Sequence, residues 1–125
     1  MQNVTTSLME YFKRSKNIGE ISKADGFGEV GLDEKGIATR ITINIDSGHI
    51  CEARFKAFGC ITSIASAAAI TEIIIGMSLE DAYSMASTEL ADILKVPDEK
   101  KYCCELAVTA VQRAIDNHKE FRMKG

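Results

Sequence analysis

The spacing of apolar residues along the chain changes near Gly59, and this change predicts the order of strands and helices. In residues 37–46 and 49–57, apolar side chains alternate with polar ones, which is typical of strands with one face on a core and the other in water. A serine–glycine pair between the two runs predicts a tight turn. The sequence therefore predicts an antiparallel hairpin, and its alternation places Cys51 on the inward face.

Beyond Gly59 the pattern is helical. Residues 60–77 are nearly apolar on all sides, which indicates a buried helix that ends at Gly76. Capping residues and apolar stripes predict further helices over residues 7–16, 78–87, 88–95 and 98–122. Because strands precede most of the helices instead of alternating with them, we expect an α+β fold. It would contain an antiparallel sheet of about three strands, with the N-terminal helix and the C-terminal helices packed on one face.

Composition narrows the class of protein. The chain has 125 residues, of which 46% are hydrophobic, so we expect one domain, residues 1–125, with a core of its own. A formal net charge of -3 gives no basic surface for nucleic acid or an anionic membrane. The longest apolar stretch, residues 61–75, is interrupted by polar side chains, and the first residues lack the layout of a secretory signal. We therefore expect a cytoplasmic protein with no nucleic-acid or membrane partner.

Four cysteines are the main candidates for chemistry. Under reducing conditions their expected uses are metal binding, catalysis or burial, and none has the CxxC spacing of a zinc finger. Cys60 lies between Gly59 and a helix start, where the helix dipole and free backbone N–H groups favour a thiolate. Burial as a small core residue explains the position of Cys60 equally well.

The remaining cysteines indicate burial when they are taken alone. Cys103 and Cys104 begin the last helix, and neighbouring helical side chains point roughly 100° apart, so the two thiols rarely share one metal ion. Cys51 is interpreted as a structural strand residue. The chain offers no assignable general acid–base pair or phosphate loop, so we do not expect an enzyme.

Four segments, in order over almost the whole chain, carry motifs that occur together in one family. Residues 52–60, Glu-Ala-Arg-Phe-Lys-Ala-Phe-Gly-Cys, continue into an alanine-rich helix. Residues 17–31 contain Asn-Ile-Gly-Glu and a glycine-rich run, and residues 76–82 read Gly-Met-Ser-Leu-Glu-Asp-Ala. Residues 96–103 read Val-Pro-Asp-Glu-Lys-Lys-Tyr-Cys. Together these segments resemble the NifU/IscU-type scaffolds of iron–sulfur cluster assembly.

The resemblance assigns roles to particular residues. Members of this family hold a cluster or a zinc ion with three cysteines, and Cys60 and Cys103 match the second and third of them. Thiolates suit both iron–sulfur and zinc chemistry. The resemblance thus implies a bound iron–sulfur cluster, of the 2Fe-2S type, or iron, with zinc as an alternative. It also implies a cysteine desulfurase as partner, and a chaperone that would bind Val96, Pro97, Asp98, Glu99 and Lys100.

The chain departs from the family at the first cysteine. Lys35 stands at that position, and a lysine ammonium cannot ligate a metal unless it loses its proton. Cys104, Asp33 and Glu34 are therefore secondary candidates for the missing ligands. A second subunit in a homo-oligomer, contributing two thiolates, is another candidate source of the missing ligands.

Three functional hypotheses remain open. The chain is a scaffold or carrier for iron or a cluster, a sulfur-accepting or zinc-binding partner of a desulfurase, or a degenerate interaction module that binds no metal. The first rests on the resemblance and the two matched cysteines. The third rests on the loss of the family's first cysteine and of its aspartate, which Ile37 replaces.

Overall fold

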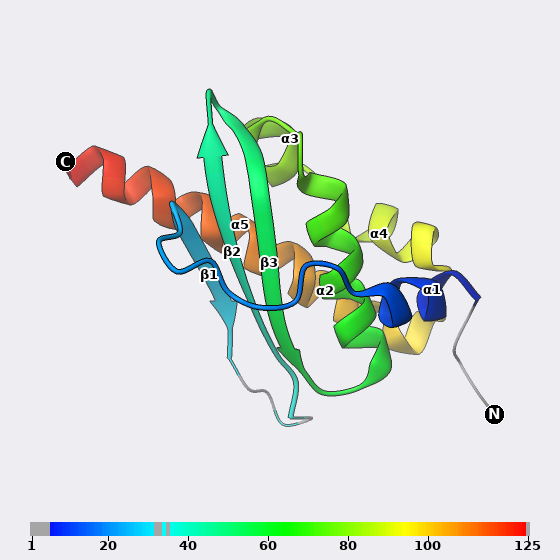
Figure 1. The fold of residues 1–125 in the computed structure, drawn as a ribbon. Helices are drawn as coiled ribbons and strands as arrows, with labels where there is room; N and C mark the ends of the chain where they lie inside the picture. Colours follow the sequence, from blue (N-terminus) through cyan, green and yellow to red (C-terminus); the bar gives the residue numbers. More distant parts are fainter. Residues whose placement is uncertain (1–5, 32–33, 35, 125) are drawn as a thin grey trace.

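The fold consists of one sheet covered by helices (Figure 1). The computed structural model describes residues 6–31, 34 and 36–124, with side chains only to residue 118. Strands β1 (Gly26–Val30), β2 (Ala38–Asp46) and β3 (His49–Phe58) form an antiparallel sheet in that spatial order. The helices are α1 (Thr6–Arg14), α2 (Ile61–Ile74), α3 (Leu79–Tyr83), α4 (Ser87–Leu94), the 3-10 turn η1 (Asp98–Lys100) and α5 (Lys101–Lys124).

The two longest helices cover the same face of the sheet. Helix α2 packs against β3, α5 packs against β1 and β2, and α1 lies on α2 and α4. In Figure 1 the long α5 runs across the sheet behind its strands. The predicted α+β fold, with three antiparallel strands and helices on one face, is confirmed. None of the helices in the described ranges is long and apolar enough to cross a membrane.

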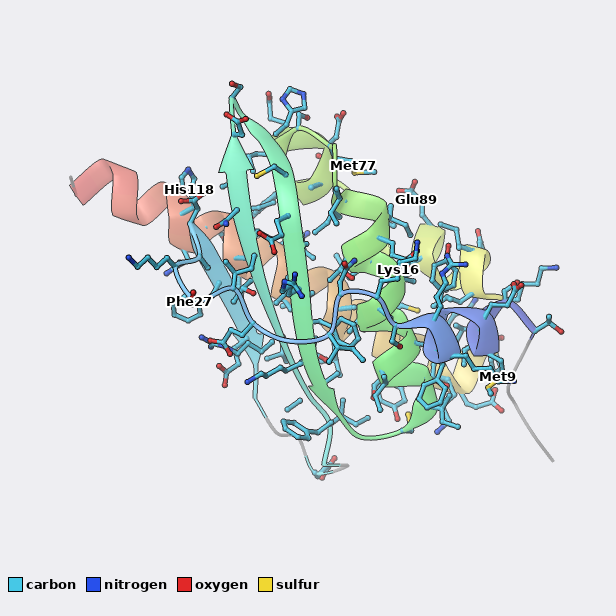
Figure 2. The ribbon with its side chains drawn as sticks, in the orientation of Figure 1. Met9, Lys16, Phe27, Met77, Glu89 and His118 are labelled. Atoms are coloured by element: carbon cyan, nitrogen blue, oxygen red, sulfur yellow. The ribbon has the colours of Figure 1, made fainter. Side chains whose placement is uncertain are left out.

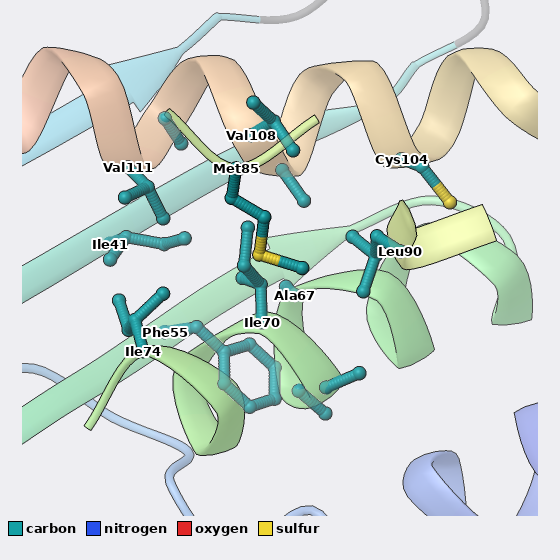
Figure 3. Packing of buried hydrophobic residues seen from close by; sticks show 14 of the residues in the cluster. Ile41, Phe55, Ala67, Ile70, Ile74, Met85, Leu90, Cys104, Val108 and Val111 are labelled. Carbon is teal, nitrogen blue, oxygen red and sulfur yellow. The ribbon is translucent and has the colours of Figure 1, made fainter. Parts of the chain in front are cut away.

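The core lies between this sheet face and the two helices (Figure 3). Ile41 and Phe55 project from the sheet toward Ile70 of α2 and Val111 of α5, and each is at most 2% exposed. Fully burying side chains of this size stabilises the fold by about 1.5–3 kcal/mol each. Because α2 also contacts α1, α4 and α5, it is enclosed on most sides, which explains its nearly continuous apolar sequence.

Glycines allow α5 to approach β1 closely. A Cβ atom on Gly28 would overlap the carbonyl oxygen of Ala110, and one on Gly26 would overlap that of Ala114. The sequence showed only a glycine-rich run here, yet the segment forms a full strand paired with β2. Because glycine has no Cβ atom, the backbone of α5 can lie directly on β1 at these two positions.

The predicted inward position of Cys51 is wrong. The β2–β3 ladder pairs Asn44 with Glu52 and Ile45 with Ile50, so Cys51 is an extra residue between the two pairs. Such a β-bulge shifts the alternation of side chains by one position. Ile50 consequently enters the core at 0% exposure, and the Cys51 side chain lies in solvent.

The outer face of the sheet is polar, as the alternation predicted. Arg40 forms ion pairs with Glu29 (2.7 Å) and Glu20 (3.1 Å), and its guanidinium lies 4.6 Å from the centre of the Phe27 ring. Figure 2 shows Phe27 on this side of β1, away from the covering helices. Exposed pairs of this kind contribute little to stability, so the helix-covered face holds the fold together.

The helix boundaries differ in detail from the predicted ones. The helix predicted over residues 98–122 is divided into η1 and α5. The predicted start at Ser78 is confirmed, because its hydroxyl oxygen accepts a hydrogen bond from the Asp81 N–H (3.1 Å). The division falls between Lys100 and Lys101, so Cys103 and Cys104 lie in the first turn of α5.

Candidate metal centre

The junction between β3 and α2 places Cys60 at the start of a helix. Gly59 has a φ of +126°, and a Cβ atom there would lie 2.8 Å from the Ile37 side chain and 3.1 Å from the Ser63 hydroxyl. Only glycine fits such a turn without strain. Cys60 follows as the N-cap residue of α2, which confirms the helix start predicted after Gly59.

Tertiary folding brings Cys103 next to Cys60. Their Sγ atoms are 3.9 Å apart, although the two residues are 43 positions apart in sequence. In a tetrahedral site with metal–sulfur bonds of about 2.3 Å, two sulfurs bound to one ion are separated by about 3.8 Å. The thiol pair is therefore already spaced to chelate a single metal ion. A disulfide, with an S–S bond of about 2.05 Å, would need the sulfurs to move together.

The two thiols differ in acidity. Burial raises the pKa of Cys60, but interactions of its thiolate with Ser63 and with the Cys103 thiol, and the charge of Lys100, outweigh it, so the net pKa lies below the ordinary value. Burial, followed by the neighbouring Cys60 thiolate, raises the pKa of Cys103 to about 12. Cys60 is half-buried and Cys103 is 1% exposed. The pair thus combines an accessible, acidic thiol with an enclosed one that holds its proton.

Cys104 points into the hydrophobic core and away from this pair. It is 0% exposed among core residues, and its Sγ lies 3.6 Å from the hydroxyl of Ser66. Figure 3 shows its sulfur on the core side of α5, near Leu90. Burial raises its thiol pKa. As placed, Cys104 does not offer its sulfur to a metal held by Cys60 and Cys103.

The loop between β1 and β2 contains the other predicted candidates. Asp33 and Lys35 lie outside the described residues, and Glu34 is exposed. The end of the loop is close to the thiols, since Ile37 contacts the Gly59 turn. Within residues 6–31, 34 and 36–118, no group of three or more histidine, cysteine or acidic side chains is arranged to hold a metal ion.

The predicted chaperone-binding segment is only partly accessible. Val96 is 7% exposed and belongs to the core, and Pro97 is half-buried. Asp98 and Glu99 are exposed on η1, while Lys100 is half-buried with its charge acting on Cys60. The sequence assigned Lys100 only to the partner-binding segment, because its effect on the Cys60 thiol depends on the tertiary structure.

An exposed apolar patch beside the thiols was not predicted. Ile18 is 59% exposed, Phe58 is 66% exposed and Ile61 is 37% exposed. The first two line a shallow groove of about 380 Å³ with Ile64 and part of β3. We call Ile18, Phe58, Ile61 and Ile64 the thiol-side patch. Phenylalanine and isoleucine on either side of Gly59-Cys60 were the available indication in the sequence.

Fold and site together define a class: a small α+β domain in which two thiols from α2 and α5 lie 3.9 Å apart. The family model described as NifU-like N terminal domain matches residues 3–124, and the chain belongs to this family. The predicted NifU/IscU-type membership is therefore confirmed.

Relatives in other organisms are similar over most of their length. The chain is 34% identical over 116 residues to the iron-sulfur cluster assembly scaffold protein IscU of Haemophilus influenzae, covering 90% of this chain and 92% of the relative. It is 33% identical over 122 residues to a Drosophila melanogaster protein named iron-sulfur cluster assembly enzyme IscU, covering 94% and 79%.

A solved structure shows the same fold. The N-terminal part of a nitrogen-fixing NifU-like protein from Brucella abortus superimposes with a TM-score of 0.78 at 16% identity, over 93% of this chain and 94% of that one. At this identity the similarity supports the fold alone.

Proposed function

We propose that this protein is a scaffold or carrier in iron–sulfur cluster assembly, and that it holds the cluster with the thiolates of Cys60 and Cys103. Family membership and the relatives named as cluster assembly scaffolds support the function. The observation that supports the site is the 3.9 Å separation of the two sulfurs, which fits one metal ion. The cluster is cargo here, and we propose the 2Fe-2S form that the family resemblance implied; the thiolates themselves suit iron–sulfur clusters in general.

The residues of the site would act in sequence. Cys60 is half-buried and has the lower pKa, so it would offer the first thiolate to incoming iron. Lys100 would balance part of the negative charge. Cys103 would release its proton only as the metal displaces it, because ligands must be deprotonated. These steps are stoichiometric, so we propose a carrier and not an enzyme with turnover, although one relative is named an enzyme.

Anaerobic reconstitution with ferric iron and sulfide tests this function. The wild-type chain should develop the visible charge-transfer absorption of a thiolate-bound cluster, and Cys60→Ser and Cys103→Ser should both lose it. Cys51→Ser is the matched control, because its exposed thiol lies on the bulge of β3. If wild type stays colourless, or if both site variants keep the absorption, the proposed function is wrong.

A sulfur-accepting role is the second candidate, favoured by the accessible low-pKa thiol of Cys60. The Cys60 thiolate would attack the outer sulfur of a desulfurase persulfide; the S–S bond would break, and the donor cysteine would leave as a thiolate. Mass spectrometry after incubation with a desulfurase and cysteine should then show one added sulfur, absent in Cys60→Ser. No added mass on wild type would argue against this role. Zinc bound in stoichiometric amount to the isolated protein would favour a zinc-binding partner.

A further inference from the structure

A second groove lies near the C-terminal end of α2, away from the thiols. It has a volume of about 390 Å³ and is bounded by residues of α2, α3 and α4 and of the segments that join them. Its apolar lining consists of Ile73, Met77, Met85 and Ile93, and its acidic lining consists of Asp81 and Glu89. Figure 2 shows Met77 and Glu89 in this part of the molecule. We call these six residues the α2–α4 groove.

The floor of the groove is fixed and apolar. Met85 is 7% exposed and belongs to the hydrophobic core, and Ile73 and Met77 are half-buried. Ile93 is 41% exposed, so part of this apolar surface lies in water. Methionine side chains adapt their shape to different apolar partners, and they are common on surfaces that bind amphipathic helices. The floor can therefore receive apolar side chains from outside the chain.

The rim of the groove is negatively charged. Asp81 and Glu89 are exposed, and neither takes part in the ion pairs found among the described residues. Residues 77–94 contain four acidic side chains, Glu80, Asp81, Glu89 and Asp92, and no lysine or arginine. A concentration of one sign of charge attracts groups of the opposite sign. The rim therefore favours a ligand that carries lysine or arginine.

We propose that the α2–α4 groove is the docking site for a basic amphipathic helix of a partner protein. Such a helix places apolar side chains three or four positions apart into a groove, and its flanking lysines or arginines pair with the acidic rim. The volume, about 390 Å³, is near the lower end for ligand pockets, so the groove accepts a few apolar side chains and leaves the rest of the helix on the surface. Anionic lipid headgroups would be repelled by Asp81 and Glu89, which argues against a membrane surface as the occupant.

Docking in the α2–α4 groove uses no residue of the thiol site. Ile73 follows Cys60 by 13 positions, which corresponds to about 20 Å along α2. The proposed contact therefore goes beyond the proposed function and does not depend on it. The protein can fail to bind a cluster and still bind a helix here, and the reverse also holds.

A designed peptide tests the proposal on the full-length, metal-free protein. The probe is a fluorescein-labelled peptide of about four helical turns, with leucines every third or fourth position and lysines and alanines elsewhere. We expect its fluorescence anisotropy to rise on titration with protein, and the affinity to fall as salt is added. Two control peptides should bind at least about tenfold more weakly. One has glutamate in place of lysine, and the other has the same composition without an apolar face.

Variants of the rim and floor locate the binding. The double variant Asp81→Asn, Glu89→Gln should weaken binding of the lysine peptide about tenfold, because two exposed ion pairs are lost. Glutamine at position 89 can still accept the hydrogen bond that the Ala86 N–H donates to the Glu89 carboxylate (3.0 Å), so α4 keeps its N-terminal cap. Ile93→Ser should weaken binding about fivefold, because it removes apolar contact.

Matched controls lie outside the lining of the groove. Glu105→Gln removes an exposed carboxylate of α5, and Ile75→Ser removes an isoleucine that is 40% exposed. Both should bind the peptide as tightly as wild type. Circular dichroism of every variant checks that the fold is retained.

Three results would overturn the proposal. The first is equal peptide affinity of wild type and the folded groove variants. The second is self-association of peptide-free wild type in sedimentation equilibrium that Ile93→Ser abolishes, because the occupant would then be a second copy of this chain. The third is displacement of the peptide by leucyl-lysine amide at comparable concentration, because the groove would then be a site for a small cationic ligand.

Discussion

Two regions of this molecule use their small and apolar residues in opposite ways. Along β1 and α5, Gly26 and Gly28 remove side chains so that the helix backbone lies directly on the strand. At the Gly59 turn, by contrast, Phe58 remains 66% exposed beside a half-buried thiol. The first region is closely packed, whereas the second leaves an aromatic ring mostly in solvent.

The two regions differ in how much they contribute to the stability of the fold. The packing of α5 on β1 contributes to the free energy of folding. A Cβ atom added at Gly26 or Gly28 would overlap backbone atoms of α5. The exposed ring of Phe58 beside Cys60 contributes little to folding, because it lies mostly in solvent. Changes in the two regions should therefore have different consequences.

The largest effect on stability is expected where α5 packs on β1. Gly28→Ala should lower the free energy of unfolding by about 3 kcal/mol, because the new Cβ overlaps the Ala110 carbonyl oxygen and α5 must move. Urea denaturation of the metal-free protein measures this. Gly31→Ala is the control, since among the described residues no atom beyond its chain neighbours lies within 4 Å of its added Cβ. Equal stability of the two variants would contradict the close packing described here.

The enclosed thiol of Cys103 should make the free energy of unfolding decrease at alkaline pH. The unfolded chain releases the Cys103 proton near the ordinary pKa of 9.0, whereas the folded chain holds it until about 12. The folded state binds more protons between these values, so stability should fall as pH rises, by up to about 1.4 kcal/mol per pH unit. Denaturant titrations of metal-free protein at several pH values measure the slope.

Cys103→Ala is the comparison for that slope. It should lose stability less steeply with pH than wild type, because it lacks the group whose proton is retained on folding. Parallel slopes for the two proteins would mean that the Cys103 thiol titrates normally in the fold.

Two adjacent cysteines allow a direct contrast between core and site. Cys104→Ala should cost about 1 kcal/mol of stability, because it leaves a small void beside Ser66, and it should keep the full cluster absorption. Cys103→Ala should abolish that absorption. Denaturation and anaerobic reconstitution of the two variants measure both quantities. Loss of the cluster in Cys104→Ala would place its thiol among the ligands after all.

The smallest effect on stability is expected on the thiol-side patch. Phe58→Ser should change the free energy of unfolding of the metal-free protein by less than about 0.5 kcal/mol, because the ring is mostly in solvent. Thermal and urea unfolding of Phe58→Ser and of wild type, compared under the same conditions, measure this change. A loss comparable to that of Gly28→Ala would show that the ring belongs to the packed part of the fold.

The sequence predicted much of this fold because local patterns agree with the tertiary structure. Alternation over residues 37–46 and the apolar run after Gly59 both reflect which faces are buried. Cys51 was misplaced because a bulge adds one residue to β3, and a single extra residue reverses the alternation without changing composition. The β1 strand was visible in the sequence only as a glycine-rich run, since its glycines carry no hydrophobic pattern.

By itself, the sequence determined the order of elements, the helix start at Cys60 and the match of two cysteines to a known family. Only the tertiary structure decided which thiols meet. Cys103 and Cys104 are adjacent in the same helix turn, yet one sulfur lies 3.9 Å from Cys60 and the other faces Ser66 in the core. The reason is that side chains 100° apart on a helix meet different neighbours. Which neighbours they meet depends on how α5 lies against α2 and the sheet, and long-range packing sets that angle.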